Sequence, residues 1–258
     1  MERVKLRDPE QTFRMLLIQG SLERAMYIKS DSTGRTAGAL YVVVIVTGMF
    51  SLAYVPGQLQ LTGDAESVVY SITSHETMYR LGILSWFVNC IAFLLLPLAF
   101  YGLFHAVHRR AAILMVAFAM ISIPVSLVAA SNEIDVLSLI SLKPPLQAVS
   151  LENRHAMVVR SLTAYDNGMF VAQLFWGLWL LPLGQLILKS RVVPRAFGVL
   201  LLLGGAGYLI QEFGGVLSNG FGRTLLSQFA TLPAATGEIG LGFWLLLRGI
   251  RQAAVNSA

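Results

Sequence analysis

Six apolar blocks, each about twenty residues long, recur along the chain and are separated by shorter polar segments. At a rise of about 1.5 Å per residue, a helix of that length is about 27–36 Å long, which matches the hydrocarbon core of a bilayer. A backbone in lipid must satisfy its hydrogen bonds within its own segment, so the blocks are predicted to be helical. The pattern predicts transmembrane helices at Ala37–Tyr54, Leu81–Phe104, Ala111–Ala130, Met169–Leu188, Ala196–Phe213 and Phe229–Leu247.

Composition supports lipid as the solvent of this chain. Hydrophobic residues make up 55% of the 258 residues and charged residues only 13%. Soluble domains carry about 25% charged residues. So few charges cannot cover the surface of a soluble domain of this length. We therefore predict an all-α integral membrane protein whose six-transmembrane-helix bundle occupies residues 32–250.

Lysine and arginine are distributed unevenly between the two predicted sides. The segments before the first helix, between the second and third, between the fourth and fifth, and after the sixth hold 14 of the 19. The positive-inside rule then predicts that both termini are cytoplasmic. This distribution explains the net charge of +5 without a nucleic-acid partner. Membrane lipids are the expected partners, and a small-molecule ligand is the other candidate.

The polar segments outside the six blocks contain further predicted elements. Residues 1–31 form a cytoplasmic segment whose pattern over 7–28 predicts an amphipathic helix on the inner leaflet, with translation from Met26 as the alternative. Asp64 precedes apolar residues at helical spacing, which predicts a short helix on the outer surface. Ser131–Tyr165 is longer than a simple turn, and its apolar run is too short and broken to cross. It is expected to lie at the interface or to cap the bundle, and residues 251–258 form a cytoplasmic tail.

Glu238 lies in the middle of the sixth block, about 13 Å from either end of the predicted helix. An acidic residue at that depth costs about 3 kcal/mol on insertion scales. The carboxyl group can hold a proton, or it can face the interior of the bundle and find hydrogen-bond donors. A functional role and a scaffold role both remain open for Glu238.

Other polar residues fall on the outer parts of the predicted helices. Asn89 is about 12 Å deep in the second helix. Asp166 and Gln173 share one face of the fourth helix with two glycines. In the fifth helix, two glycines and Glu212 follow one another at intervals of seven residues, which also places them on one face. We predict an outward-facing polar pocket between the second, fourth, fifth and sixth helices. Its candidate ligand-binding residues are Glu238, Arg80, Asn89, Gln173, Asp166 and Glu212.

A purely structural role for these residues is the alternative. Polar side chains often hydrogen-bond neighbouring membrane helices together, and small residues let their backbones approach closely. This interpretation is favoured for Asn89 and Gln173. Solvation or an interfacial ion pair is the simpler account of Asp166, Glu212 and Arg80, which lie near the lipid–water boundary.

Metal-binding and catalytic motifs are not evident in the sequence. His105 and His108 have the spacing of half a metal site, but the predicted cytoplasmic loops offer no carboxylate to complete it. Cys90 is the single cysteine, which excludes an intramolecular disulfide. No nucleophile–base constellation can be assembled. We therefore expect no metal site, no cofactor and, as the favoured interpretation, no enzymatic activity.

Four sequence stretches carry a resemblance to a known family: Gly34–Ser51, Gly63–Leu84, Leu181–Ile210 and Gly237–Gly249. In order and spacing they are similar to a bacterial membrane family known as domain of unknown function 4386. The resemblance implies a six-helix or closely similar integral membrane domain in the bacterial inner membrane, and it implies no activity. On matching positions it draws attention to Asp64, Arg80, Arg195 and Glu238.

Two functional hypotheses follow. In the first, the protein binds or transports a small polar or lipid-like ligand in the outward pocket, with Glu238 as a proton-linked or ligand-contacting group. In the second, it is a non-catalytic structural or regulatory membrane subunit whose polar groups only order the bundle. An intramembrane enzyme is the least favoured class.

Overall fold

The structure is a computed structural model that describes residues 32–141, 149–218 and 220–250. Every regular element among these residues is helical, and six helices are long and apolar enough to cross a membrane. This confirms the predicted all-α class. The amphipathic helix predicted before residue 32 and the tail after residue 250 lie outside the described residues. The six spans are Ser32–Gln58, Glu76–Phe104 (α4), Arg109–Ile140 (α5), Leu151–Ser190 (α6), Arg195–Leu217 (α7) and Leu225–Arg248.

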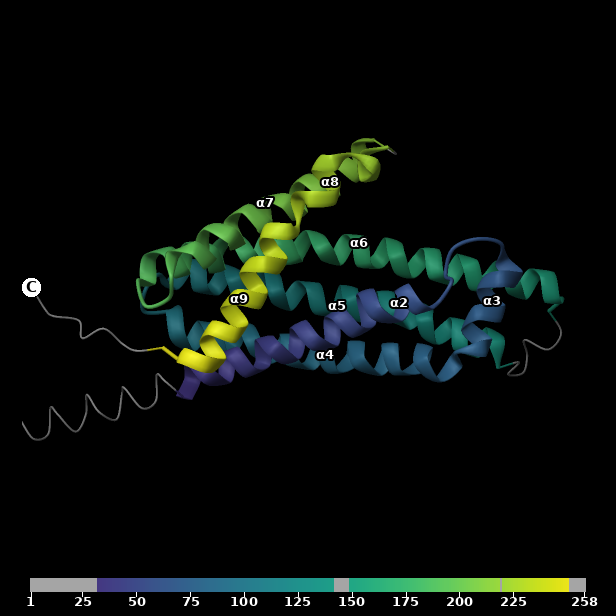
Figure 1. The fold of residues 1–258 in the computed structure, drawn as a ribbon, viewed down its shortest axis with the longest axis horizontal. Helices are drawn as coiled ribbons and strands as arrows, with labels where there is room; N and C mark the ends of the chain where they lie inside the picture. Colours follow the sequence, from purple (N-terminus) through teal and green to yellow (C-terminus); the bar gives the residue numbers. More distant parts are fainter. Residues whose placement is uncertain (1–31, 142–148, 219, 251–258) are drawn as a thin grey trace, which may run out of the picture.

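Each span packs against its neighbours in sequence, and together the six spans form a ring. Figure 1 shows this bundle from the side. The sixth span consists of α8 (Leu225–Ala230) and α9 (Leu232–Arg248), with a break at Thr231. The ring closes between the first span and α9. A Cβ atom added at Gly38 would lie 2.3 Å from the backbone nitrogen of Leu246, so only glycine permits this approach.

We call the end of the bundle near Gln58 the outer end, and at this end the first span changes its helical geometry. It contains a π-helical turn, η1 (Phe50–Tyr54), followed by the short helix α2 (Val55–Gln58) with Pro56 in its first turn. A proline clashes with the carbonyl group four residues earlier and provides no N–H for it. That carbonyl group belongs to Leu52, inside η1. The π-helical turn is thus located where the chain has to accommodate Pro56.

The helices around the outer end are longer than the apolar blocks that predicted them. The segment Ser131–Tyr165, expected at the interface or as a cap of the bundle, is helical over most of its length, because α5 continues to Ile140 and α6 begins at Leu151. Charged residues interrupt the hydropathy of these extensions, but their apolar positions keep helical spacing. Four of them are buried: Val136, Leu139, Val158 and Leu162.

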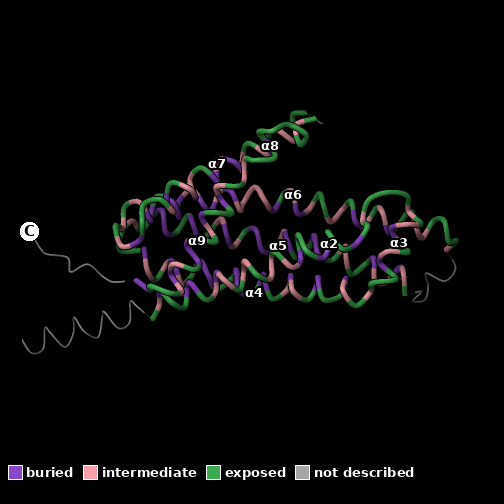
Figure 2. Tube along the Cα trace, in the orientation of Figure 1, coloured by how far each residue is buried: buried purple, intermediate pink, exposed green. Residues whose placement is uncertain are grey.

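The predicted surface helix after the first span is present as α3 (Ala65–Ser74). Asp64 is its N-cap, and its Oδ1 accepts a hydrogen bond from the backbone N–H of Ser67 over 2.9 Å. This bond and a second one from the Ser67 hydroxyl hold the pKa of the Asp64 carboxyl below its usual value. Val68 and Ile72 of α3 are buried in the same outer cluster as the extensions of α5 and α6 (Figure 2).

Glycines spaced seven apart join α6 to α7. A Cβ atom at Gly184 would meet the carbonyl oxygen of Gly198 at 2.8 Å, and one at Gly198 would meet that of Gly184 at 2.9 Å. Gly177 and Gly205 make the same reciprocal approach at 3.0 and 2.8 Å. The shared glycine faces seen in the sequence therefore form a tight helix–helix contact, which is the structural interpretation of small residues in membrane helices.

Candidate functional site

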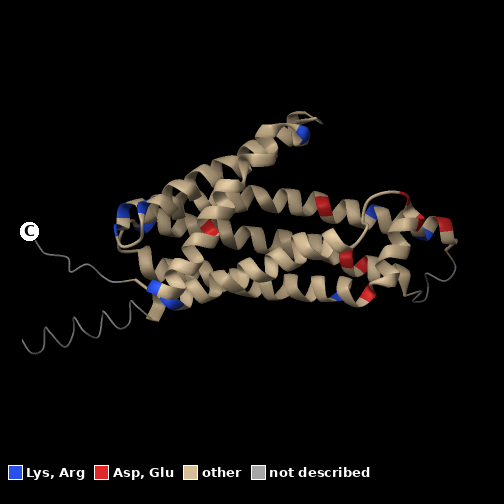
Figure 3. Cartoon of the chain, in the orientation of Figure 1, with Lys and Arg blue, Asp and Glu red and all other residues tan. Residues whose placement is uncertain are grey.

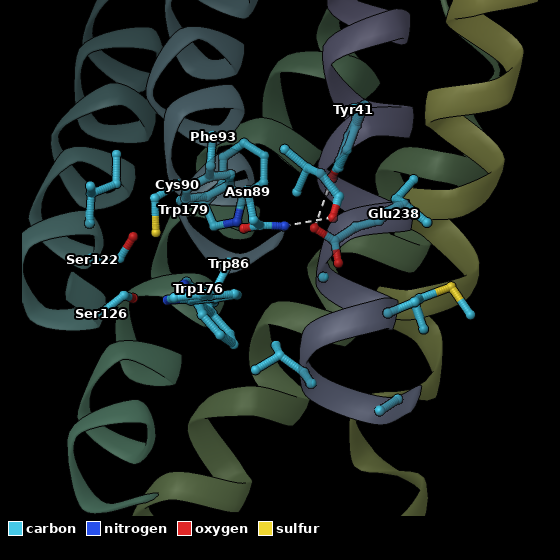
Figure 4. Close-up of a pocket in the computed structure, with 18 of the residues that line it drawn as sticks. Tyr41, Trp86, Asn89, Cys90, Phe93, Ser122, Ser126, Trp176, Trp179 and Glu238 are labelled. Atoms are coloured by element: carbon cyan, nitrogen blue, oxygen red, sulfur yellow. Dashed lines mark hydrogen bonds between the residues drawn. The ribbon is translucent and has the colours of Figure 1, made fainter. Parts of the chain in front are cut away.

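A cavity of about 310 Å³ lies inside the ring, and all six spans contribute to its wall (Figure 4). We call it the central cavity. Its volume is at the lower end of the range of about 300–1,000 Å³ found for small-molecule pockets. Its polar and thiol-bearing lining residues are Tyr41, Trp86, Asn89, Cys90, Ser122, Ser126, Trp176, Trp179, Tyr208 and Glu238.

Glu238 lines the central cavity and has a partner from the opposite end of the sequence. The hydroxyl group of Tyr41 in the first span donates a hydrogen bond to Glu238 Oε1 over 2.8 Å. The Tyr41 side chain is 1% exposed, and its ring packs edge-on against Phe100 and obliquely against Trp179. Packing against α4 and α6 thus fixes the position of the Tyr41 hydroxyl group, which donates to Glu238.

Asn89 of α4 also lines the central cavity, but its side chain forms hydrogen bonds with the first span. Its side-chain nitrogen donates to the carbonyl oxygen of Val44 over 2.7 Å and to Thr47 Oγ1 over 3.1 Å (Figure 4). One turn away, the Ser85 hydroxyl donates to the carbonyl oxygen of Thr47. These bonds give Asn89 a structural role in joining α4 to the first span.

Aromatic rings form much of the remaining wall. Trp86 and Trp176 lie with their ring centroids 6.0 Å apart, and Trp176 meets Tyr208 edge-on at 6.5 Å. Phe93 and Trp179 meet edge-on at 5.0 Å. Trp86 is 3% exposed, yet its indole N–H has no hydrogen-bond acceptor among the described residues. A buried donor without a partner is uncommon and requires an explanation.

The central cavity opens sideways between the first span and α9. Its lining includes apolar residues that are exposed on the outside of the bundle, among them Met49, Leu52 and Ile239. The first span and α9 touch closely at Gly38, whereas η1 and α2 at the other end of this span pack against α4. The two spans therefore diverge from a closed end, and the exposed apolar residues lie along the resulting gap.

A second cavity of about 660 Å³ lies toward the outer end of the bundle. We call it the outer cavity. It shares Leu52, Trp176 and Tyr208 with the central cavity, so these side chains separate the two spaces. Glu133 and Asp166 contribute carboxyl groups to its wall, with Gln173 beside them. Tyr79 also lines it and is 2% exposed, with no hydrogen-bond partner for its hydroxyl group among the described residues.

The six candidate residues from the sequence fall into three groups. Asn89 and Glu238 line the central cavity, and Asp166 and Gln173 line the outer cavity. Arg80 lines neither of these cavities and donates to Glu76 on its own helix over 2.7 Å. Glu212 also lines neither cavity; it is 4% exposed, and both of its carboxyl oxygens lack a hydrogen-bond partner in the described part of the chain.

The wall of the central cavity includes residues that the sequence did not indicate. The first span and α5 contribute to the central cavity, although the prediction placed only the second, fourth, fifth and sixth helices around it. Tyr41 lies near the inner end of an apolar block, where tyrosine is usually read as an interface anchor. Glu133 was assigned to an external segment because the outer extension of α5 was not predicted.

The histidines contact their own helix ends. His105 Nδ1 lies 2.9 Å from the carbonyl oxygen of Tyr101, and His108 Nδ1 accepts a hydrogen bond from the backbone N–H of Ala111 at the start of α5. Over residues 32–141, 149–218 and 220–250, no group of three His, Cys, Asp or Glu side chains could hold a metal ion.

Comparisons with known proteins give a family but no activity. A curated relative, an uncharacterized protein of Archaeoglobus fulgidus (strain ATCC 49558 / DSM 4304 / JCM 9628 / NBRC 100126 / VC-16), is 26% identical over 99 residues, which is 38% of this chain and 57% of that protein. The chain therefore spans little more than half the length of this relative. No solved structure matches the chain. The model of the family described as domain of unknown function (DUF4386) matches residues 36–249, so the chain belongs to that family and is a multi-pass membrane protein.

Proposed function

We propose that this protein binds a small lipid-like molecule in the central cavity and receives it from the bilayer. One observation carries the proposal: a cavity with a carboxyl group at its wall opens between the first span and α9 through residues that face outward. The carboxyl group of Glu238 is the ligand-contacting group in this proposal. The molecule would have an apolar body with one polar group.

The character of the wall supports such a ligand. Most of the lining is aromatic or aliphatic, and the polar groups are few and held in place by packing. That combination is typical of small-molecule sites, where apolar residues supply contact area and isolated polar groups supply orientation. The N–H of Trp86, which has no acceptor among the described residues, is one of these isolated polar groups.

The lateral gap supports access from lipid. Met49 is 58% exposed and Leu52 is 38% exposed, although both line the cavity. In a membrane these residues contact acyl chains, so an apolar molecule can move from the bilayer to the cavity without crossing water. The second hypothesis, a subunit that binds no ligand, accounts for Asn89 and for the glycine contacts but gives no role to this gap.

The orientation is also part of the proposal. Lys and Arg gather at the end of the bundle where the first span begins and α9 ends, as Figure 3 shows. This end contains Arg109, Arg110, Lys189, Arg191, Arg195 and Arg248, whereas carboxyl groups lie in the middle and at the opposite end. The positive-inside rule places the basic end in the cytoplasm, in the inner membrane of a bacterium, so the outer cavity faces away from the cytoplasm.

Cys90 supplies a direct test, because it lines the central cavity and is the single cysteine of the chain. The protein is reconstituted into vesicles of the uncharged lipid digalactosyldiacylglycerol, and its alkylation by N-ethylmaleimide is followed by mass spectrometry. Decanol, decanoate and decyltrimethylammonium are added as probes with different polar groups. We expect at least one of them to slow alkylation of Cys90 in a saturable manner.

Two variants serve as controls for this measurement. Ser126→Phe fills the cavity, so the probes should no longer change the alkylation rate in this variant. In Cys90→Ala/Val128→Cys the thiol is moved to an outward position on α5 that is 70% exposed, where probes should not protect it. If none of the three probes protects Cys90 in the otherwise native chain, the proposed function is wrong.

A further inference from the structure

We infer that the ligand of the central cavity is a lipophilic cation, an amine or quaternary ammonium group attached to an apolar body. The inference rests on the proposed function and specifies the chemistry of its ligand. It follows from the charges that line the two cavities and from the arrangement of aromatic rings around Glu238.

The charges are all of one sign. Glu238 lines the central cavity, and Glu133 and Asp166 line the outer cavity. Within the described ranges, no lysine, arginine or histidine lines either of these cavities. Arg80 faces Glu76, and the basic residues at the cytoplasmic end lie beyond the cavity wall. A bound anion would therefore meet only like charge, in a setting where water screens little.

Among the residues that the structure describes, Glu238 has no cationic partner. Its hydrogen bond comes from Tyr41, a neutral donor. An ionised carboxyl group inside a bilayer needs an opposite charge or a proton, because lipid does not solvate it. A cationic ligand supplies that charge without any proton transfer. With a neutral ligand, the carboxyl group has to take up a proton instead.

The aromatic rings provide the second half of a cation site. Tyr41, Trp86, Phe93, Trp176, Trp179 and Tyr208 line the same cavity as Glu238. Their centroids lie 5.0 to 6.5 Å apart in tilted or edge-on pairs, so the rings surround the space from several directions. The negative faces of such rings attract quaternary ammonium groups, most strongly where the contact is desolvated.

Both cavities offer carboxyl groups to a cationic ligand. Trp176 and Tyr208 separate the outer cavity, with its two carboxyl groups, from the central cavity. The cationic group can contact Glu133 or Asp166 from the outer side, while the apolar body occupies the lateral gap beside Met49 and Ile239.

The test compares two probes of the same shape in the native chain. Decyltrimethylammonium and its uncharged carbon isostere, 2,2-dimethyldodecane, are titrated, and protection of Cys90 against N-ethylmaleimide is compared as a function of their measured concentration in the vesicle membrane. We expect the cation to protect at a concentration about tenfold lower or better, which corresponds to about 1.4 kcal/mol. This comparison needs no substitution and so does not depend on how a variant folds.

The variant Glu238→Gln then tests whether the carboxyl group causes the preference for the cation over its uncharged isostere. The amide oxygen can still accept the hydrogen bond from Tyr41, so the contact between the first span and α9 is kept while the charge is lost. We expect the cation to lose its advantage in this variant, with protection by the uncharged isostere unchanged within about twofold. Glu212→Gln is the matched control, because it removes a buried carboxyl group that lines neither cavity, and it should leave the preference intact.

The outcomes separate this inference from the proposed function. If the uncharged isostere or decanoate protects as well as the cation, the site binds ligands but the inferred charge is wrong. A cation preference that survives in Glu238→Gln overturns the role given to this residue. If no decyl compound protects Cys90, the proposed function fails and this inference fails with it.

Discussion

Tyr41 and Glu238 are 197 residues apart in the sequence, yet the tyrosine hydroxyl donates a hydrogen bond to the glutamate over 2.8 Å. The bond joins the first span to the last at the wall of the central cavity. Close approach of Gly38 to the backbone of Leu246 holds the same two spans together nearer the end where the first span begins. The polar contact and the glycine contact thus define one closed end, from which the lateral gap begins.

Removal of this hydrogen bond should destabilise the bundle. Tyr41→Phe keeps the ring against Phe100 and Trp179 but leaves Glu238 without its donor. Interhelical hydrogen bonds in membrane proteins contribute about 0.5–2 kcal/mol, so we expect a loss of that size in the free energy of unfolding. Steric-trapping or denaturant unfolding in micelles measures it. Tyr54→Phe, at a ring that is 52% exposed, is the control and should change the free energy little; equal effects would contradict the assigned role.

The closest glycine contact between α7 and the sixth span gives a second prediction. A Cβ atom at Gly207 would lie 1.8 Å from the carbonyl oxygen of Ala230, so Gly207→Ala forces the two segments apart. We expect a loss of about 1–3 kcal/mol in the free energy of unfolding, as for other overpacked interiors. In contrast, a Cβ atom at Gly57 has open space around it, and Gly57→Ala should be neutral or stabilise α2 slightly. Thermal unfolding of the two alanine variants in the same detergent compares them, and similar melting temperatures would refute the contact.

Asn89 and Asn132 differ in what their amide groups join. The Asn89 amide donates across to the first span, whereas the Asn132 amide donates to Val128 and Ala129 on its own helix. We expect Asn89→Ala to lower the free energy of unfolding by about 1–2 kcal/mol and Asn132→Ala by less than about 0.5 kcal/mol. Chemical unfolding of both variants tests this. A larger effect at Asn132 would mean that the α4 contact with the first span is not stabilising.

The N-cap of α3 should make the stability of this helix depend on pH. The pKa of Asp64 is lowered from its ordinary value of 3.8 by the hydrogen bonds from Ser67, so the capped state favours the ionised carboxyl group. The stabilisation is therefore present above about pH 4 and is lost as the pH falls through the lower pKa of the folded state. Hydrogen exchange of the α3 amides, corrected for intrinsic rates, should rise below pH 4 relative to the amides of α4.

Asp64→Asn provides the control for that measurement, because an asparagine side chain can still cap a helix but does not titrate in this range. Exchange in α3 should then show no extra rise at low pH. Asp64→Ala should show raised exchange at neutral pH as well. A pH response that persists in Asp64→Asn would assign the effect to another group.

Local sequence determined the class and the elements of this protein. An apolar run of about twenty residues predicts a helix that crosses a bilayer whatever its neighbours are, because lipid imposes the requirement on each segment separately. The cap at Asp64 followed from the same kind of local pattern, and the structure confirms it. The outer extensions of α5 and α6 were missed because their charges lower the local hydropathy, while burial against α3 depends on residues far away in the chain.

Only the tertiary structure decided which polar groups meet. The sequence placed Glu238 in the middle of a helix, but neither its spacing nor its neighbours indicated that Tyr41 lies beside it. The glycines that share faces with polar residues in α6 and α7 form the place where these two helices touch, and the central cavity lies on another side. Helical spacing fixes which side chains share a face, whereas the rotation and tilt of each helix in the ring fix what that face meets. Those two quantities come from the sum of all contacts between the spans, which no single stretch of sequence contains.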